Sequence, residues 1–378
     1  MSSTEHNRQA LLTQFEPLCF PGLEPFTAQD FESYLNSPSQ FEFSLKKVRG
    51  QHILYGPAHA KARQAFFNEL PQDQRCTLLV SKLDAQNLPN FELIDVQDIG
   101  VGHSVYALTL KTPYQGHTHW VLKREDLPNQ SLFCKLLTTL GWPSYISTHF
   151  ETPKIRCEFS HFLGTTTLLN HANNPQLEYQ LARHAALGDI LGRGDRHFNN
   201  YMLRDHDLLP IDISYLFWEG NEDWDRRYIA GGMYEFSMLA RYDGETLREK
   251  TKHFFEVYAE TLGFLKAQQP LLEDNILTFS GDHPLQARAK LTFIQNRLSN
   301  ITTYFDAQKA LYLAALQELQ KRQVLKAKLF EKVAHSPEIL DQHPLLKMYY
   351  LADQDQPSCF FLLEEHPQVE ILLGTLGR

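Results

Sequence analysis

The pattern of apolar and polar positions divides the chain into a strand-rich part and a helix-rich part. The first 40 residues show no regular period, and a helix is then predicted at 58–69. Alternating positions predict strands at 91–100, 103–113 and 118–123. The last two of these are joined by Tyr-Gln-Gly-His, a turn sequence that predicts a hairpin.

Downstream of these strands the pattern becomes mainly helical. Helical spacing is found at 128–140, at 175–191 and over a long stretch from about 284 to 334. Two further strands are predicted between the first two of these helices, at 144–151 and 154–164. A strand-rich part followed by a helical part predicts an α+β fold.

Composition limits the class of protein. With 378 residues, 43% of them apolar and 12% aromatic, the chain can bury a large core and form about two domains. The net charge of −9 argues against a general nucleic-acid binder. Five cysteines without a CxxC pair indicate reduced thiols, and no run approaches the ~18 apolar residues of a transmembrane helix. We therefore expect a cytoplasmic protein with no transmembrane segment.

The strongest chemical signal is the stretch GDRHFNNYMLRDHDLLPIDISYLF. Asp195 is followed five positions later by Asn200, and seventeen residues after Asp195 comes Asp212, at the end of an apolar run. A short predicted hairpin, 201–204 with 208–212, separates them. Phosphoryl transfer needs a carboxylate to orient the attacking hydroxyl, a carboxylate for Mg²⁺ and an amide oxygen that helps to hold the metal. This spacing supplies all three; the alternative is a charged surface turn.

The DRHxxN pattern followed by an aspartate at a strand end resembles the catalytic and metal loops of phosphoinositide 3-kinase-like kinases. It is also similar to the kinase-like domains of lanthionine synthetases and to aminoglycoside phosphotransferases. The resemblance implies that Asp195 accepts the proton of the attacking hydroxyl and that His197 lines the active site. It also implies that Asn200 and Asp212 hold Mg²⁺, or Mn²⁺ in its place, while ATP is bound.

The same resemblance implies a bilobal protein-kinase-like fold. Such a fold has a β-rich N-lobe and a helical C-lobe, here with a helical C-terminal extension. The expected division is an N-terminal extension at 1–90, a kinase N-lobe at 91–163, a kinase C-lobe at 164–283 and a helical C-terminal region at 284–378.

A glycine-containing turn between two predicted strands is the candidate phosphate loop. Gly100 and Gly102 let backbone amides approach phosphates, and Ser104 follows them. Lys123 lies one strand later, where a kinase places the lysine that contacts the α- and β-phosphates. The segment Glu158-Phe159-Ser160 ends the last predicted N-lobe strand, at the hinge where its backbone groups would meet adenine. The alternatives are an ordinary hairpin turn, a solvated lysine and an ordinary strand end.

Three features depart from the protein-kinase pattern. The helix after the strand lysine contains no acid, and the candidate partners outside it are Glu125, Glu151 and Glu158. The third residue of the metal loop is Ser214 instead of glycine, which is freer to change conformation. Residues 215–236 contain no Ser or Thr, and no APE-like anchor follows, so we do not expect switching by Ser/Thr phosphorylation in this segment.

A basic cluster precedes the predicted strands. Residues 44–68 include several cations and no acid. The cations expected to bind a polyanion are Lys46, Lys47, Arg49, Lys61 and Arg63. The cluster is either a solvated face or a site for an inositol polyphosphate or a phosphoinositide headgroup. The second alternative resembles secreted bacterial effector kinases that depend on a host inositol polyphosphate, and entry into a host cytosol without a cleaved signal peptide stays open.

The function expected from these features is ATP- and Mg²⁺-dependent phosphorylation of Ser/Thr hydroxyls on a protein substrate, activated by the polyanion. Two alternatives of other classes remain open. One is a kinase of lipids, inositols or other small molecules, which the DRH pattern favours. The other is a pseudokinase, a binding module without catalysis. The acid-free helix favours a pseudokinase, whereas the presence of both aspartates and Asn200 argues against it.

Overall fold

The computed structural model describes most of the chain between residues 64 and 338. The described residues are 64, 68–83, 92–100, 105–112, 116–125, 127–151, 156–164, 175–196, 200–218, 235–280 and 284–338. They form a mixed structure with a small antiparallel sheet and many helices, as the α+β prediction requires. Among these residues, each helix is too short or too polar to cross a bilayer.

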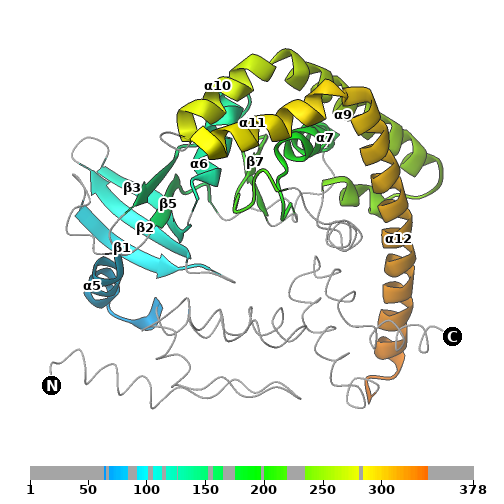
Figure 1. Ribbon diagram of the computed structural model, residues 1–378. Helices are drawn as coiled ribbons and strands as arrows, with labels where there is room; N and C mark the ends of the chain where they lie inside the picture. Colours follow the sequence, from blue (N-terminus) through cyan, green and yellow to red (C-terminus); the bar gives the residue numbers. More distant parts are fainter. Residues whose placement is uncertain are drawn as a thin grey trace. The chain divides into compact units, whose positions relative to one another are not determined.

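The described elements fall into two compact units (Figure 1). Among the described elements, α5 and the five-stranded sheet belong to the sheet unit. Its elements are α5 (Gln72–Leu83), β1 (Glu92–Asp98), β2 (Val105–Thr112), β3 (Gly116–Arg124), β4 (Ser147–Glu151) and β5 (Arg156–His161). The helical unit contains all other described elements, which begin with α6 at residue 129.

The sheet is antiparallel, with the strand order β1-β2-β3-β5-β4. Strand β2 alternates as predicted, because Tyr106, Leu108 and Leu110 are buried while the residues between them are more exposed. It pairs with β3 from Val105 opposite Lys123 to Thr112 opposite Gly116. The predicted hairpin is therefore confirmed.

Helix α5 was not predicted. Its sequence, QDQRCTLLVSKL, has apolar residues at positions 76, 79, 80 and 83, which is helical spacing, and Pro71 directly before it is a helix start signal. The segment was instead assigned to a stretch of alternating apolar positions. Most of the helix predicted at 58–69 lies outside the described residues. The Asn68 side chain nevertheless forms hydrogen bonds with the edge strand β1. It donates to the backbone oxygen of Asp98 (3.1 Å) and accepts from the Asp98 amide (2.9 Å). The Asn68 side chain thus satisfies the backbone N–H and C=O of Asp98 at the edge of the sheet.

The helical unit is built around a large apolar core, with a smaller cluster of Cys134, Tyr145 and Leu209 beside it in the same unit. Its elements are α6 (Asn129–Thr139), α7 (Pro175–Leu191), β6 (Tyr201–Arg204), β7 (Asp207–Pro210), η4 (Glu235–Arg241), α9 (Gly244–Ala267), α10 (Gln269–Ser280), α11 (Pro284–Ser299) and α12 (Ile301–His335). The helices predicted at 128–140 and 175–191 are confirmed as α6 and α7. The hairpin predicted around residue 206 is confirmed as β6 and β7, although β7 ends two residues before Asp212.

The long helix predicted at 284–334 is two helices. Asn300 separates α11 from α12, and its backbone (φ −113°, ψ 48°) is not helical. Serine and asparagine at 299 and 300 favour helix ends over helix interiors, because their side chains compete for backbone hydrogen bonds. The Asn300 carbonyl then accepts the first helical bond of α12 from the amide of Tyr304 (2.9 Å).

Helix α6 belongs to the helical unit although it lies between β3 and β4 in the sequence. Its apolar side chains Leu132, Phe133, Leu136 and Leu137 are buried in the same core as α7. Residues 128–146 therefore group with the helical unit, whereas the sequence placed them in the predicted lobe at 91–163. The predicted domain boundaries stay predictions.

Candidate active site

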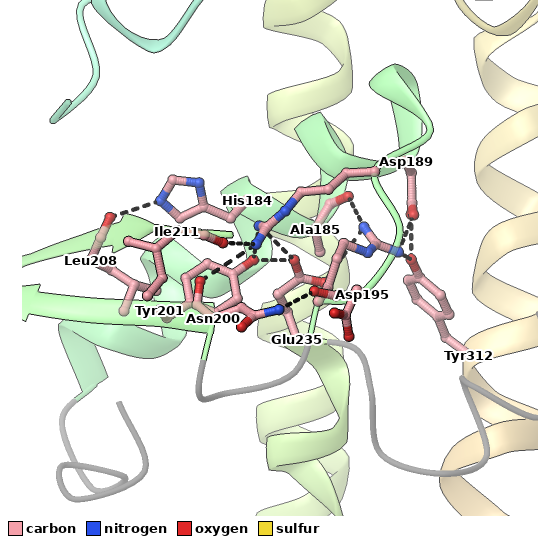
Figure 2. Close-up of polar contacts among 12 residues, drawn as sticks. His184, Ala185, Asp189, Asp195, Asn200, Tyr201, Leu208, Ile211, Glu235 and Tyr312 are labelled. Carbon is pink, nitrogen blue, oxygen red and sulfur yellow. Dashed lines mark hydrogen bonds and ion pairs between the residues drawn. The ribbon is translucent and has the colours of Figure 1, made fainter. Parts of the chain in front are cut away.

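The first part of the candidate site is the catalytic loop, which follows α7 and contains Asp195. Asn200 lies at the far end of this loop and donates from Nδ2 to the backbone oxygen of Asp195 (2.8 Å; Figure 2). Because the donor end of the Asn200 amide is used within the loop, its oxygen end is directed elsewhere, as a metal ligand requires. His197, the third predicted residue of this loop, lies outside the described residues.

The metal loop, residues 212–214, joins the catalytic loop through the backbone. The amide of Ile211 donates to the oxygen of Asn200 (2.8 Å), which places Asp212 one residue beyond that hydrogen bond. The Ser214 hydroxyl donates to Oδ1 of Asp212 (3.0 Å). The structure therefore brings Asp195, Asn200 and Asp212 into one cluster of loops.

Both aspartates have left-handed backbone conformations. Asp195 has φ 51° and Asp212 has φ 56°, and only two other non-glycine residues in the described part of the chain have positive φ. Aspartate tolerates this region better than most residues, but the conformation still has to be held by surrounding contacts. Such backbone conformations concentrate at functional sites. Their position on these two residues supports a chemical role for both.

Two glycines let the segment after the metal loop lie against the catalytic loop. The amide of Phe217 donates to the Leu191 oxygen (2.7 Å), and the amide of Trp218 donates to the Gly192 oxygen (3.2 Å). A Cβ on Gly192, which has φ 60°, would lie 2.8 Å from the Trp218 oxygen. A Cβ on Gly194 would lie 3.2 Å from Cβ of Tyr215. Larger residues would push the two segments apart.

Arg193 connects the catalytic and metal loops from inside the helical unit. Its guanidinium donates to the Tyr201 hydroxyl (2.8 Å) and to the backbone oxygens of Ile211 (3.4 Å) and Asn200 (3.5 Å). The Tyr201 hydroxyl in turn donates to Glu235 (Figure 2). Burial, the largest effect, raises the pKa of Tyr201 well above its usual value, so the phenol keeps the proton that it donates.

Arg196, next to the candidate base, is held by three elements. Only 1% of it is exposed. Its guanidinium donates to Asp189 of α7 (2.6 Å) and to the Tyr312 hydroxyl of α12 (3.0 Å), and it lies 3.5 Å from a carboxylate oxygen of Glu235 in η4. Tyr312 also donates to Asp189 (Figure 2), and so does Tyr258. The charged side chains of this buried cluster are therefore paired with opposite charge or hydrogen-bonded.

The sequence pattern did not identify Arg193, Arg196, Asp189 and Glu235 as site residues. Glu235 lies within the segment 215–236, is fully buried and pairs with Arg196. The available signal was an acid between two aromatic residues, Tyr234 and Phe236, where a solvated carboxylate is not expected. The partners themselves are not visible in the sequence.

The strand lysine lies in the sheet unit and is held locally. Lys123 is 8% exposed, and its Nζ lies 2.8 Å from Oε2 of Glu125. Of the three acids considered as partners, Glu125 is thus in direct contact. Glu158 lies directly opposite Lys123 on β5, is 1% exposed, and accepts a hydrogen bond from the Ser147 hydroxyl (3.1 Å). The structure describes nothing of the Glu151 side chain.

The segment Glu158-Phe159-Ser160, predicted to end the strand at the hinge, lies one residue before the end of β5 at His161. Glu158 itself pairs with Lys123 of β3 and with His149 of β4, and its carboxylate is buried. The hinge role of this segment stays a prediction.

The base of the candidate phosphate loop is also held within the sheet unit. The amide of Ile99 donates to the Val105 oxygen (2.9 Å), and the Gly100 amide donates to the Asp98 carboxylate (3.0 Å). Gln64 donates to the Gly100 oxygen (3.0 Å).

Several predicted residues lie outside the described part of the chain. These are Gly102 and Ser104 of the phosphate loop and the basic residues Lys46, Lys47, Arg49, Lys61 and Arg63. Within the described part, no three His, Cys, Asp or Glu residues gather as a metal site. Asn200 and Asp212 would be sufficient as protein ligands of Mg²⁺. This ion commonly binds one or two protein carboxylates and keeps waters and phosphate oxygens as its other ligands.

Comparison with protein-family models and with curated proteins gives no match. Similar solved structures include the proinflammatory kinase CtkA of Helicobacter pylori, which is 10% identical with a TM-score of 0.35. That match covers 56% of this chain and 92% of CtkA. The open conformation of CtTel1 is 10% identical with a TM-score of 0.36, and the match covers 84% of this chain but only 17% of CtTel1. Similarity at this level identifies no family for the chain.

Proposed function

We propose that the protein is an atypical kinase with a bilobal protein-kinase-like fold, which transfers phosphate from ATP to Ser/Thr hydroxyls of a protein substrate. The observation that supports this most strongly is the cluster of Asp195, Asn200 and Asp212. The two loops that carry them are joined by backbone hydrogen bonds, and both aspartates have left-handed backbones. A carboxylate base, a metal-binding carboxylate and an amide ligand are the groups that phosphoryl transfer uses.

In the proposed reaction Asp195 orients the substrate hydroxyl and accepts its proton. The hydroxyl oxygen bonds to the γ-phosphorus of ATP while the bond from that phosphorus to the β,γ-bridging oxygen breaks, and ADP leaves. Asn200 and Asp212 would hold Mg²⁺, which neutralises charge on the phosphates. The hydrogen bond from Ser214 to Oδ1 of Asp212 fixes the direction of that carboxylate.

Lys123 would bind the α- and β-phosphates, and Gly100, Gly102 and Ser104 would shape the loop around them. Glu125 supports this role because it lies two residues from the lysine and contacts it directly. The lysine is therefore held without an acid from the following helix. We propose that Glu158 supports the nucleotide side through its buried carboxylate.

The decisive test is transfer of labelled phosphate by Asp212→Asn and Asp205→Asn variants. Both aspartates have a left-handed backbone, with φ 56° and 57°, but Asp205 is in the exposed turn between β6 and β7. Asparagine tolerates this conformation, so the two substitutions are matched in backbone cost. Asp212→Asn should lower transfer roughly a hundredfold or more, and Asp205→Asn should leave it unchanged. Undiminished transfer by Asp212→Asn would sink the assignment.

The substrate class needs a separate comparison. Myelin basic protein, phosphoinositide vesicles and an aminoglycoside would be offered side by side with labelled ATP and Mg²⁺. Label in the protein at Ser or Thr supports the proposal. Label only in the lipid or the aminoglycoside would replace the protein substrate by a small molecule, and label in none of the three would favour a pseudokinase.

Activation by an inositol polyphosphate is part of the proposal and is supported by the sequence. Lys46, Lys47, Arg49, Lys61 and Arg63 are cations in a segment without acids, and clustered cations bind polyanions in a salt-dependent way. Phosphate transfer should rise when inositol hexakisphosphate is added and fall as salt is raised. Changing Lys46 and Lys47 to Glu should weaken this response. Full activity without any added polyanion would contradict it.

A further inference from the structure

The first two residues of α6 contact the metal loop, although they lie more than 80 residues away in the sequence. Asn129 donates from Nδ2 to the backbone oxygen of Ser214 (2.8 Å, 85 residues apart). The backbone amide of Ile213 donates to Oε1 of Gln130 (3.4 Å, 83 residues apart). Asn129 is 5% exposed and Gln130 is 8% exposed. Two buried amide side chains thus bond the two residues that follow Asp212.

These contacts are not helix caps. Polar residues at a helix start commonly bond the first free amides of their own helix, but the start of α6 has no side-chain cap and no acid in its first turn. Asn129 and Gln130 instead serve backbone groups of another segment. An unpaired backbone group in such a buried place would cost roughly 1–3 kcal/mol. The side chains of Asn129 and Gln130 therefore stabilise the backbone conformation of the metal loop.

The remainder of α6 is fixed in the helical unit by packing and hydrogen bonds, and this holds Asn129 and Gln130 in place. Leu132, Phe133 and Leu136 are buried in the core of the helical unit. At the other end of the helix, the Thr139 hydroxyl donates to the Lys135 oxygen (2.9 Å) and to Asn275 of α10 (3.3 Å). Because the helix is held along its length, its first turn can fix the metal loop.

The absence of acids from α6 has a chemical reason in this arrangement. A carboxylate at position 129 or 130 would place negative charge beside Asp212 and the phosphates that it is proposed to serve, and like charges at short range are unfavourable. Neutral amides provide the same donor and acceptor without that charge. The first turn of α6 therefore suits a loop that carries its own metal-binding carboxylate.

We propose that Asn129 and Gln130 are positioning residues that hold the metal loop so that Asp212 binds the divalent cation. This inference rests on the proposed function, since it assigns the two amides to its metal site. Together with the Ser214 hydroxyl, they fix the loop at three consecutive residues, including the left-handed Asp212. Residues that orient metal ligands in this way typically contribute about 10–100-fold to metal affinity or activity.

The test uses the full-length chain and measures binding of Mn²⁺ directly. Electron paramagnetic resonance gives the Mn²⁺ dissociation constant in the presence of a non-hydrolysable ATP analogue. Gln130→Met keeps the length of the side chain and removes the acceptor, and Asn129→Leu removes the donor. Thr139→Val is the matched control, because it removes hydrogen bonds from the other end of α6 and leaves the metal loop untouched.

Either loop-facing variant should raise the Mn²⁺ dissociation constant by about 10-fold or more, while Thr139→Val leaves it at the wild-type value. The Mg²⁺ concentration for half-maximal phosphate transfer should rise in parallel, with a smaller change in KM for ATP. Melting temperatures by circular dichroism separate this effect from unfolding, and Asn129→Ala provides a smaller truncation if a larger substitution prevents folding.

The outcomes separate the two proposals. If the wild type binds Mn²⁺ with nucleotide and the folded Asn129 and Gln130 variants bind it equally well, the positioning role is wrong and the proposed function stands. If Thr139→Val weakens Mn²⁺ binding as much as the other variants, α6 acts only through its stability and the positioning role is again wrong. If the wild type binds no Mn²⁺ with nucleotide, both proposals fall.

Discussion

The strand lysine and the two candidate aspartates are held in different ways. In the sheet unit, Lys123 contacts Glu125, two residues away, and lies opposite Glu158 on the neighbouring strand. In the helical unit, the loops of Asp195 and Asp212 are held by side chains from α6, α7, η4 and α12, some more than 100 residues distant. The proposed nucleotide-binding residues thus depend on local contacts within the sheet unit, and the proposed catalytic residues depend on the tertiary packing of the helical unit.

This difference predicts where the protein is sensitive to substitution. Removing one partner of a buried, hydrogen-bonded charge cluster leaves uncompensated charge and is strongly destabilising. Lys123 and Glu125 form a single ion pair between residues two positions apart, so a substitution there disturbs fewer contacts. Damage to the helical unit should therefore lower stability and activity together, whereas damage to the lysine contact should mainly affect nucleotide binding.

The largest expected effect is that of Arg196→Met. The substitution leaves Asp189 and Glu235 buried without their shared cation, and it should lower the free energy of unfolding by about 3–5 kcal/mol. Urea unfolding followed by circular dichroism measures this change. The control is Arg248→Ala, which removes an ion pair to Glu245 on the exposed surface of α9 and should change stability by less than about 1 kcal/mol. Equal losses of unfolding free energy for the two substitutions would show that the buried cluster contributes no more to stability than an exposed ion pair.

A pH effect of intermediate size is expected at His184, which is buried in the helical unit. Burial, with the nearby charge of Arg193, lowers the pKa of His184 to about 3, although its bond to the Leu208 oxygen acts in the opposite direction. Since the unfolded chain has the usual pKa of about 6.5, the neutral ring supports the fold above that pH. This support is lost as the pH falls from about 6.5 toward 3.

His184→Gln provides the comparison for this pH effect, because glutamine can still donate a hydrogen bond but does not titrate. Between pH 7.5 and pH 5, the wild type should lose about 2 kcal/mol more stability than the variant. Urea unfolding at the two pH values gives the difference. Parallel losses in wild type and variant would show that His184 does not titrate as its burial predicts.

Two glycine-to-alanine substitutions compare the packed and open parts of the helical unit. A Cβ on Gly188 of α7 would lie 2.5 Å from Nη1 of Arg196, whereas nothing lies within 4 Å of a Cβ on Gly263 of α9. Because the Arg196 guanidinium is fixed by its buried partners, Gly188→Ala should cost roughly 1–3 kcal/mol and slow phosphate transfer. Gly263→Ala should add about 0.5–1 kcal/mol, as alanine favours helix.

Thermal melting distinguishes the two glycine variants by the sign of the change. A rise in melting temperature for Gly263→Ala and a fall for Gly188→Ala is expected. A rise for both would mean that Arg196 can move away from α7, and the tight packing proposed around the catalytic loop would be wrong.

The smallest effect is expected at the lysine. Glu125→Gln keeps an oxygen beside Lys123, and other groups of the sheet unit remain in place. The pair is nearly buried, but glutamine keeps a hydrogen-bond acceptor for Lys123, so we expect a loss of stability of about 1 kcal/mol. We also expect a rise of a few-fold in KM for ATP with little change in kcat. Initial rates of phosphate transfer over a range of ATP concentrations measure this. A loss as large as that of Asp212→Asn would show that the lysine is held as critically as the metal loop.

The sequence predicted those parts of the fold that depend on local pattern. Strand alternation located β1 to β5, helical spacing located α6 and α7, and a turn sequence located the β6–β7 hairpin. The prediction overlooked α5, although its apolar residues at 76, 79, 80 and 83 have helical spacing. Local pattern failed at Asn300, where a short break divides a long helical stretch.

In the candidate site, too, features set by local spacing could be predicted and long-range contacts could not. The spacing of Asp195, Asn200 and Asp212 could be read directly, because one hairpin connects the loops. The residues that hold those loops could not be read, because Glu235 and Asn129 reach them across long stretches of chain. A side-chain contact of this kind leaves no periodic signal, and an acid-free helix looks like a missing part until its amides are seen to contact the metal loop.

The most direct test of the proposed kinase function is a thermal shift with Mg²⁺ and ATP, alone and together, with and without inositol hexakisphosphate. A ligand at about 100 times its dissociation constant stabilises the folded state by about 2.7 kcal/mol. We predict that Mg·ATP raises the melting temperature of the wild type by several degrees and that Asp212→Asn loses most of this rise, whereas Asp205→Asn keeps it. An unchanged melting temperature for the wild type in all mixtures would contradict the account.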